Sequence, residues 1–128
     1  PMEGTREYGL LVPQVDADGN DMGGIRSIGV QVPRATLTGW NYFRSDRFGG
    51  GFCNLQGSAF PFAATRAERD RTGDPRPSLE ERYPTRDAYV AAVRQAAMRL
   101  VAQRFLLDED AQAAIAAAER DGPAPMAR

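Results

Sequence analysis

The chain has 128 residues, about the length of one domain, and a formal net charge of −1 from 16 basic and 17 acidic side chains. This balance gives no overall field that would attract nucleic acid or an anionic membrane. The sequence contains neither lysine nor histidine, which excludes Schiff-base enzymes, Walker-type phosphate loops and the usual base for a serine or cysteine nucleophile.

The first 33 residues predict a β-hairpin. Its two strand candidates are residues 8–15 and 27–33, and in the second isoleucine and valine alternate with glycine, glutamine and proline, the pattern of a half-buried strand. Pro13 and Pro33 limit both strands to the edges or ends of a sheet. We expect no signal peptide before the first strand. Because the chain opens at Pro1 rather than at an initiator methionine, we also expect either a processed piece or a cloned fragment of a longer protein.

Residues 16–21, between these strands, have the alternating carboxylates of a calcium loop but also the residues of a tight turn. An EF-hand loop that began at Asp16 would need glycine at its sixth position and glutamate at its twelfth, and these positions hold Asp21 and Ser27. An aspartate–glycine pair in its middle is typical of a turn between strands. We therefore interpret the segment as a turn and expect that it binds no calcium.

Residues 34–84 are rich in glycine and proline, which predicts long ordered loops with short helical turns. Within this region, residues 65–73 predict a short helix with a threonine N-cap and a glycine at its end. Residues 78–84 begin with the serine–glutamate spacing of a capping box and end at a proline, which predicts a second short helix.

Residues 85–121 contain no glycine or proline and 12 alanines, which predicts a pair of α-helices. The first helix runs from Thr85 to about Leu106, and the acidic residues 108–110 provide an N-cap and negative charge at the start of the second. The second helix ends near Gly122, and residues 122–128 form a frayed tail. No apolar run in the chain approaches the ~20 residues of a membrane span.

The first of these helices has a broad apolar face. The second offers only Ile115 and alanines, too narrow a stripe to cover that face, so we expect the chain alone to expose an apolar patch. The chain would then self-associate through this helix or be only partly ordered in residues 34–64. The residues of the apolar face are Tyr89, Val93, Ala97, Leu100, Val101 and Phe105.

Residues 49–58 contain three successive glycines and the only cysteine, Cys53. The glycines are not followed by the lysine of a phosphate loop, and Cys53 has no obvious activating base. A single cysteine also excludes an internal disulfide and a thiolate zinc cluster. Ser58 does not lie in a G-x-S-x-G elbow. We interpret this stretch as a tightly turning loop and predict no catalytic, cofactor-binding or metal-binding residue in the chain.

Two further groups of side chains have a functional and a structural interpretation. The aromatic residues and arginines of 38–48 would suit the stacking of nucleic-acid bases, but the charge balance favours their role as anchors of a long loop. The neighbouring carboxylates Asp74, Glu80 and Glu81 resemble an acid–base pair. Because Arg76 and Arg82 alternate with them, local ion pairing explains them more simply.

Three stretches of the sequence resemble a known family: "LVPQVDADGNDMGGIR" (11–26), "VPRATLTGWNYF" (32–43) and "GSAFPFAATRAERDRTGDPRPSLEERYPTRDAYVAAV" (57–93). Together they resemble the C-terminal stretch of a large bacterial α/β-hydrolase-domain family, and the resemblance covers residues 8–119. Its most specific part is residues 67–84, because no general rule of folding demands that pattern.

The predicted hairpin, loops and helix pair together give an α+β fold. The resemblance implies that the chain is the C-terminal segment of a soluble, esterase-like serine hydrolase whose catalytic triad lies upstream. It implies no catalytic residue in this chain, and only Trp40 and Asn41 are candidates for the wall of a pocket. The expected partner is the upstream catalytic domain or a second copy of the chain, with no cofactor, nucleic acid or membrane. The alternative is a free-standing interaction module that self-associates through its C-terminal helices.

Overall fold

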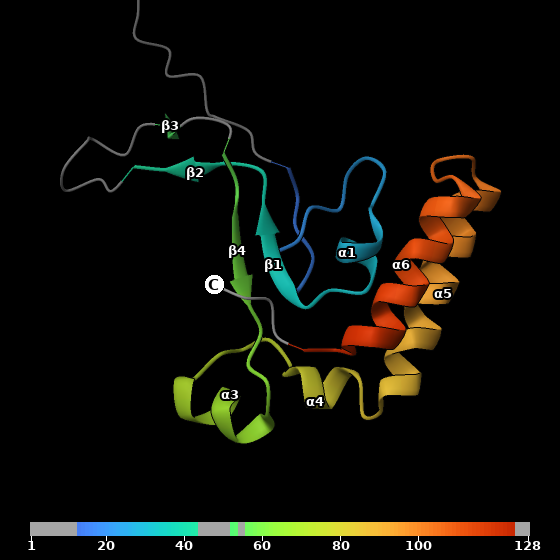
Figure 1. The fold of residues 1–128 in the computed structure, drawn as a ribbon. Coiled ribbons are helices and arrows are strands. Elements are labelled where there is room, and N and C mark those ends of the chain that lie inside the picture. The colour runs from blue at the N-terminus through green and yellow to red at the C-terminus, as the bar shows by residue number, and fades with distance from the viewer. Residues whose placement is uncertain (1–12, 44–51, 54–55, 125–128) are drawn as a thin grey trace, which may run out of the picture.

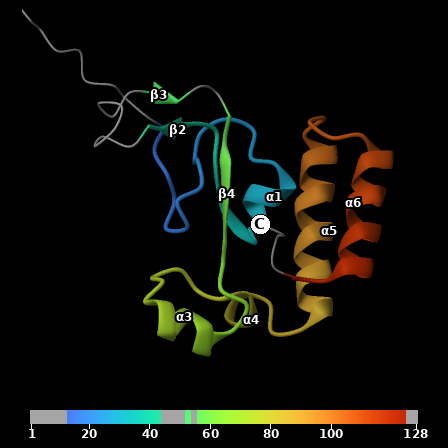
Figure 2. The same cartoon turned by 60° about the vertical axis from the view of Figure 1, so that its left-hand side comes forward.

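The computed structural model describes residues 13–43, 52–53 and 56–124. In Figure 1 the pair of long helices α5 and α6 stands on one side, the β-strands stand on the other, and α1 lies between them. Figure 2 shows α3 and α4 beyond the end of β4. The architecture is α+β, as predicted. The elements are α1 (Ile28–Gln31), β1 (Ala35–Thr38), β2 (Asn41–Tyr42), β3 (Phe52–Cys53), β4 (Ser58–Pro61), α3 (Arg66–Thr72), α4 (Leu79–Arg82), α5 (Arg86–Ala102) and α6 (Asp108–Asp121).

The strands form two antiparallel pairs inside the region predicted to be loop. β1 pairs with β4 so that Ala35 lies opposite Pro61 and Thr38 lies opposite Ser58, and β2 pairs with β3. The expectation of loops and helical turns alone in residues 34–84 is therefore wrong at these strands. They are only two to four residues long, too short for a period-2 pattern to distinguish them from loop.

The predicted strand at residues 27–33 is also wrong, because the chain forms the short helix α1 there. An apolar residue at both Ile28 and Val32 fits the i, i+4 spacing of a helix as well as the alternation of a strand. Both side chains pack in the core, where Val32 is 7% exposed. Of the predicted hairpin, the described residues retain one isolated antiparallel bridge, between Val15 and Asp21. Residues 8–12 of its first strand lie outside the described residues.

The turn predicted within residues 16–21 is confirmed. The Oδ1 atom of Asp16 accepts hydrogen bonds from the backbone N–H groups of Asp18 at 2.9 Å and Asn20 at 3.0 Å. Gly19 has a φ of 79°, in the left-handed region that glycine adopts without steric cost. The Asp16 carboxylate therefore organises the backbone of the turn.

Asn20 fastens this turn to the β-sheet. Its side chain is completely buried; its Nδ2 atom donates to the carbonyl of Ala35 at 3.2 Å, and its Oδ1 atom accepts from the N–H of Leu37 at 2.8 Å. These two backbone groups lie on the edge of β1 that faces away from β4. The amide of Asn20 thus takes the place of a neighbouring strand.

Both short helices predicted in residues 65–84 are confirmed. Thr65 caps α3 by accepting from the N–H of Glu68, and α3 ends at a left-handed Gly73 with a φ of 67°. The capping box of Ser78 and Glu81 is complete at the start of α4. These helices were predictable because their caps are local, within three residues of the groups they satisfy.

The two C-terminal helices are confirmed, with shifted ends. The first begins after Thr85, whose side chain caps it, but ends at Ala102 rather than near Leu106. The second has Leu107 as its N-cap residue, with no side-chain hydrogen bond, so the N-cap predicted among residues 108–110 is wrong. No helix in the described ranges has the length and apolar character needed to cross a bilayer.

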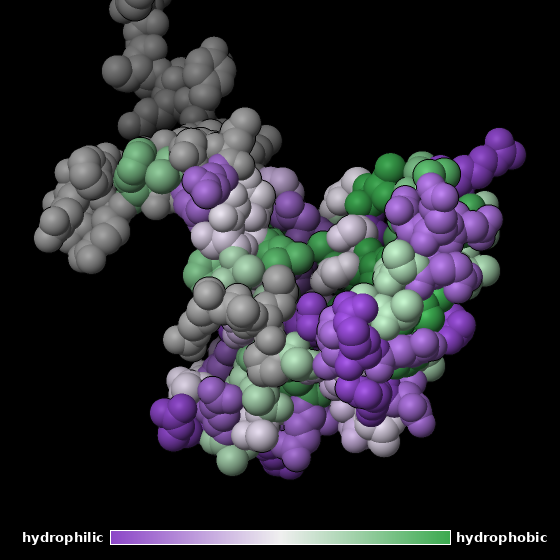
Figure 3. Space-filling view, viewed as in Figure 1, coloured by the Kyte–Doolittle hydropathy of each residue, from purple (hydrophilic) through white to green (hydrophobic). Residues whose placement is uncertain are grey.

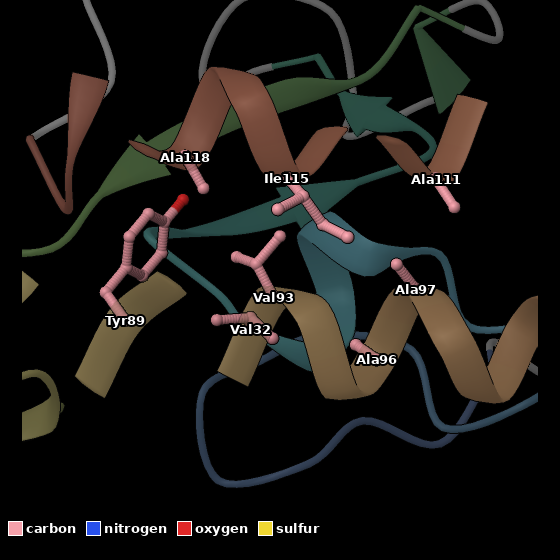
Figure 4. Packing of buried hydrophobic residues seen from close by; sticks show 8 residues of the cluster. All are labelled: Val32, Tyr89, Val93, Ala96, Ala97, Ala111, Ile115 and Ala118. Carbon is pink, nitrogen blue, oxygen red and sulfur yellow. The ribbon is translucent and has the colours of Figure 1, made fainter. Parts of the chain in front are cut away.

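The expectation that the apolar face of the first long helix stays uncovered is wrong over most of its length. Figure 4 shows Val93 of α5 beside Ile115 of α6, with Val32 reaching the same place from the end of α1. The alanines do not leave the face bare, since small side chains let the two helices approach closely. Among the residues of the predicted apolar face, only Phe105, beyond the end of α5, is largely exposed, at 55%. The buried cluster consists of Val32, Tyr89, Val93, Ala96, Ala97, Ala111, Ile115 and Ala118.

We predict that Asn20→Ala lowers the free energy of unfolding by about 2–6 kcal/mol, because it leaves two backbone groups unpaired at roughly 1–3 kcal/mol each. Urea denaturation measures the change. The exposed Gln14, on the same segment, provides the control, since Gln14→Ala should change stability by less than about 0.5 kcal/mol. Equal effects of the two substitutions would show that Asn20 does not anchor the turn.

Candidate functional site

A cluster of charged side chains surrounds a buried aromatic ring, Phe62, which directly follows β4 and is 3% exposed. The guanidinium carbons of Arg76 and Arg82 lie 4.9 Å and 4.3 Å from the centre of this ring. Both distances are within the range of cation–π attraction. We refer to these three residues as the Phe62 stack.

Arg76 is held by a carboxylate on its own loop and by the sheet. Its Nε atom donates to Oδ1 of Asp74 at 2.9 Å, and its Nη2 atom donates to Oδ2 at 2.6 Å. Its Nη1 atom donates to Oγ1 of Thr36 at 2.7 Å and to the carbonyl of Phe60 at 3.1 Å. The hydrogen bonds from Arg76 hold the pKa of Asp74 below its usual value, although partial burial opposes them. Asp74 is therefore an ion-pair partner, kept ionised.

Arg82 connects the other side of the ring to the N-terminal turn. Its two terminal nitrogens donate to the two carboxylate oxygens of Asp18, one of them at 2.8 Å, and its Nε atom donates to the carbonyl of Pro77 at 2.9 Å. Asp18 also accepts, through its backbone carbonyl, a hydrogen bond from the hydroxyl of Thr36. A two-pronged Arg–carboxylate contact of this kind fixes orientation as well as distance.

The other two candidate acid–base carboxylates are also engaged. An oxygen of Glu80 accepts from the N–H of Arg66 at 3.0 Å. Glu81 accepts from both the N–H and the hydroxyl of Ser78, at 2.9 and 2.7 Å, and these bonds lower the pKa of Glu81. It also pairs with Arg69 at 3.4 Å. Ion pairing is confirmed for Asp74 and Glu81, although Arg82 pairs with a distant aspartate rather than with its neighbours.

Tyr83 belongs to the same region, and the sequence did not identify it. Its hydroxyl donates to the carbonyl of Pro33 at 3.0 Å, and its ring meets that of Tyr89 edge-to-face, with centroids 5.0 Å apart. Burial raises the pKa of Tyr83 to about 12. The hydroxyl therefore keeps its proton and acts as a hydrogen-bond donor that joins α4 to the chain before β1.

Asn41, a predicted pocket-wall residue, clamps the junction of the two strand pairs. Its Nδ2 atom donates to the carbonyl of Gln56 at 2.6 Å, and its Oδ1 atom accepts from the hydroxyl of Ser58 at 3.0 Å. Trp40, the other candidate, precedes it and is half-buried. Neither residue lines either of two depressions found in the described part of the chain.

The remaining candidates are placed as follows. Cys53 is half-buried in β3, where it faces Asn41 across the strand pair. The three glycines at 49–51 lie outside the described residues. In the turn of residues 16–21, Asp16 forms an ion pair with Arg26. The turn and this ion pair account for the Asp16 carboxylate without a metal ion. That calcium does not bind here stays a prediction.

The larger depression, about 850 Å³, lies between β4 and α3. Its wall combines the apolar run from Ala59 to Ala64 with three charged residues, Glu68, Asp74 and Arg76. A smaller, mainly apolar one of about 270 Å³ lies where α1 meets the two long helices. No group of three or more metal-ligating side chains occurs in the described ranges.

The described part of the chain is thus an α+β segment in which arginines, carboxylates and hydroxyls are used mainly to hold loops on a small sheet. The family model described as "Alpha/beta hydrolase domain" matches residues 2–116. The chain belongs to this α/β-hydrolase-domain family, which confirms the family proposed from the sequence. No curated protein and no solved structure matches the chain.

We predict that Gly57→Ala strongly destabilises the strand pairs. A Cβ atom at this position would lie 1.8 Å from the carbonyl oxygen of Thr38, so the backbone has to move. Overpacking of this kind costs about 1–3 kcal/mol or more. Gly39, in the same hairpin, has no atom within 4 Å of an added Cβ and provides the matched control. Thermal unfolding of both variants tests this; equal midpoints would contradict it.

We predict that the Asp74–Arg76 pair makes stability depend on acid pH. The folded-state pKa of Asp74 lies below its unfolded value of about 3.9, so the stabilisation is present above that pH and is lost as pH falls through the folded value. The variant Asp74→Asn should therefore be less stable than the original chain at pH 7, with the difference shrinking below about pH 4. Urea titrations at pH 7, 5 and 3 measure it. A difference independent of pH would mean that the charge is unimportant.

Proposed function

We propose that this chain is a non-catalytic structural segment of an esterase-like serine α/β hydrolase and that it packs against the catalytic domain, where it contributes to the wall of the active-site pocket. The observation that carries the proposal is the use of its polar groups. Of the catalytic candidates raised by the sequence, Ser58 donates to Asn41 and Asp74 is paired with Arg76. Their hydrogen bonds hold the fold together rather than activate a nucleophile.

The sequence supports the same conclusion from a different direction. A serine or cysteine hydrolase usually needs a general base within hydrogen-bond reach of its nucleophile, and histidine is absent from all 128 residues. Family membership nevertheless associates the chain with a hydrolase domain. Both facts are consistent if the catalytic residues lie in another part of the same polypeptide.

We predict no esterase turnover by this chain alone, and turnover by a longer polypeptide that also contains the catalytic domain. Hydrolysis of a p-nitrophenyl ester measures both. Deletion of this segment from the longer polypeptide should reduce its activity or its thermal stability. Turnover by the purified chain, together with covalent labelling of Ser58 or Cys53 by a serine- or cysteine-directed probe, would disprove the proposal.

A self-associating module is the alternative, and one observation favours it. Apolar residues are exposed where α5 joins α6: Met98 is 46%, Phe105 55% and Leu107 63% exposed. In Figure 3 hydrophobic residues gather near the top of the helical pair, whereas hydrophilic residues cover much of its lower part. An apolar tip of this kind is typical of a contact surface.

Light scattering over a range of concentrations separates the alternatives. The module hypothesis predicts that the original chain is a dimer and that Leu107→Asp dissociates it. The segment hypothesis predicts a monomer for both the original chain and the variant. Since Leu107 is exposed, the substitution should leave the helical circular dichroism signal unchanged, which serves as its control for folding.

A further inference from the structure

The outer edge of β4 presents a backbone donor and acceptor that have no partner among the described residues. The N–H of Phe62 donates to the carbonyl of Arg34 at 3.0 Å, which shows that the opposed residues Ala35 and Pro61 form a non-hydrogen-bonded pair. Hydrogen-bonded and non-hydrogen-bonded pairs alternate along an antiparallel ladder. Leu37 and Ala59, two residues further along the ladder, therefore form another non-hydrogen-bonded pair. The N–H and C=O of Ala59 therefore point away from β1.

The same alternation can be checked on the other strand. The outward groups of β1 are the carbonyl of Ala35 and the N–H of Leu37, and both are bound by the side chain of Asn20. One edge of the sheet is thus closed by the protein itself. On the opposite edge, Pro61 has no N–H, and within the described ranges its carbonyl accepts a single long hydrogen bond of 3.5 Å, from Arg76. No acceptor for the N–H of Ala59 is found in the described ranges.

The free edge opens into the larger depression. Ala59, Phe60 and Pro61 of β4 form one wall, and Glu68 and Thr72 of α3 form part of the other. Phe60 is 50% exposed, so this strand edge also offers an apolar side chain to a pairing partner. The volume of about 850 Å³ is enough to hold an extended segment of several residues.

The charges of this groove favour a basic occupant. Asp74 and Arg76 neutralise each other through their two hydrogen bonds. Glu68 accepts from the N–H of Ala64 at 2.9 Å, but it has no cationic partner among the residues that the structure describes. An arginine or lysine that entered the groove would therefore meet one uncompensated carboxylate.

We infer that β4 accepts an additional strand from the catalytic domain of the same hydrolase polypeptide. The strand pairs with the backbone of Ala59, places an apolar side chain on Phe60 and directs a basic side chain toward Glu68. This inference rests on the proposed function, because it identifies where the segment meets the catalytic domain.

Amide hydrogen exchange, measured residue by residue, tests the inference. In the 128-residue chain alone, the N–H of Ala59 should exchange rapidly and that of Phe60, which faces β1, should exchange slowly. In the longer polypeptide that contains the catalytic domain, the exchange of Ala59 should slow by at least about 100-fold. The ratio of the exchange rate of Ala59 to that of Phe60 within each sample corrects for differences in overall stability between the samples.

Ala59→Pro provides a variant that removes only the outward N–H, at a position where an edge strand tolerates proline. It should leave the unfolding midpoint of the chain alone unchanged and lower that of the longer polypeptide. Phe60→Pro, which breaks the pairing with β1, should destabilise both and serves as the matched control.

The outcomes separate the two proposals. An active longer polypeptide in which Ala59 exchanges as fast as in the chain alone would overturn the strand addition and leave the proposed function standing. A longer polypeptide without a catalytic domain would overturn both.

Discussion

The burial of Phe62 between Arg76 and Arg82 is the constraint on which the loop-rich half of the protein depends. Each arginine can be placed against the ring only because a carboxylate, Asp74 or Asp18, compensates its charge. The stack therefore joins four parts of the chain: β4, the loop after α3, α4 and the N-terminal turn. A buried phenylalanine contributes roughly 1.5–3 kcal/mol by area, and each cation–π contact about 0.5–2 kcal/mol.

Sequence reasoning predicted the elements whose signals are local. The helices α3 and α4 were predicted from threonine, serine, glutamate and glycine within a few positions of their ends, and α5 was predicted from the periodicity of Tyr89, Val93 and Leu100. It failed where pairing is distant, as in β1 with β4, whose partners Thr38 and Ser58 are 20 residues apart. It also failed at residues 27–33, because two apolar residues four positions apart satisfy both a helix and a strand.

The candidate site was predicted in composition but not in arrangement. Ion pairing was expected near Asp74, yet the partner of Arg82 is Asp18, 64 residues away, and no periodicity indicates such a contact. Asn41 fixes a strand junction, a role that the sequence did not indicate, and its expected place at a pocket wall stays a prediction. The stretch of residues 67–84, which no general folding rule explains, supplies both arginines of the stack and the capping box. Its specificity therefore reflects a structural requirement that depends on tertiary contacts.

The central claim is that the paired charges of this chain build its structure, and a double-mutant cycle between Asp18 and Arg82 tests it most directly. The free energy of unfolding would be measured for the original chain, Asp18→Asn, Arg82→Gln and the double variant. Because the pair is partly buried and held by two hydrogen bonds, we expect a coupling energy of about 1.5–3 kcal/mol. A coupling energy near zero would contradict the claim, since the two side chains would then contribute to stability independently.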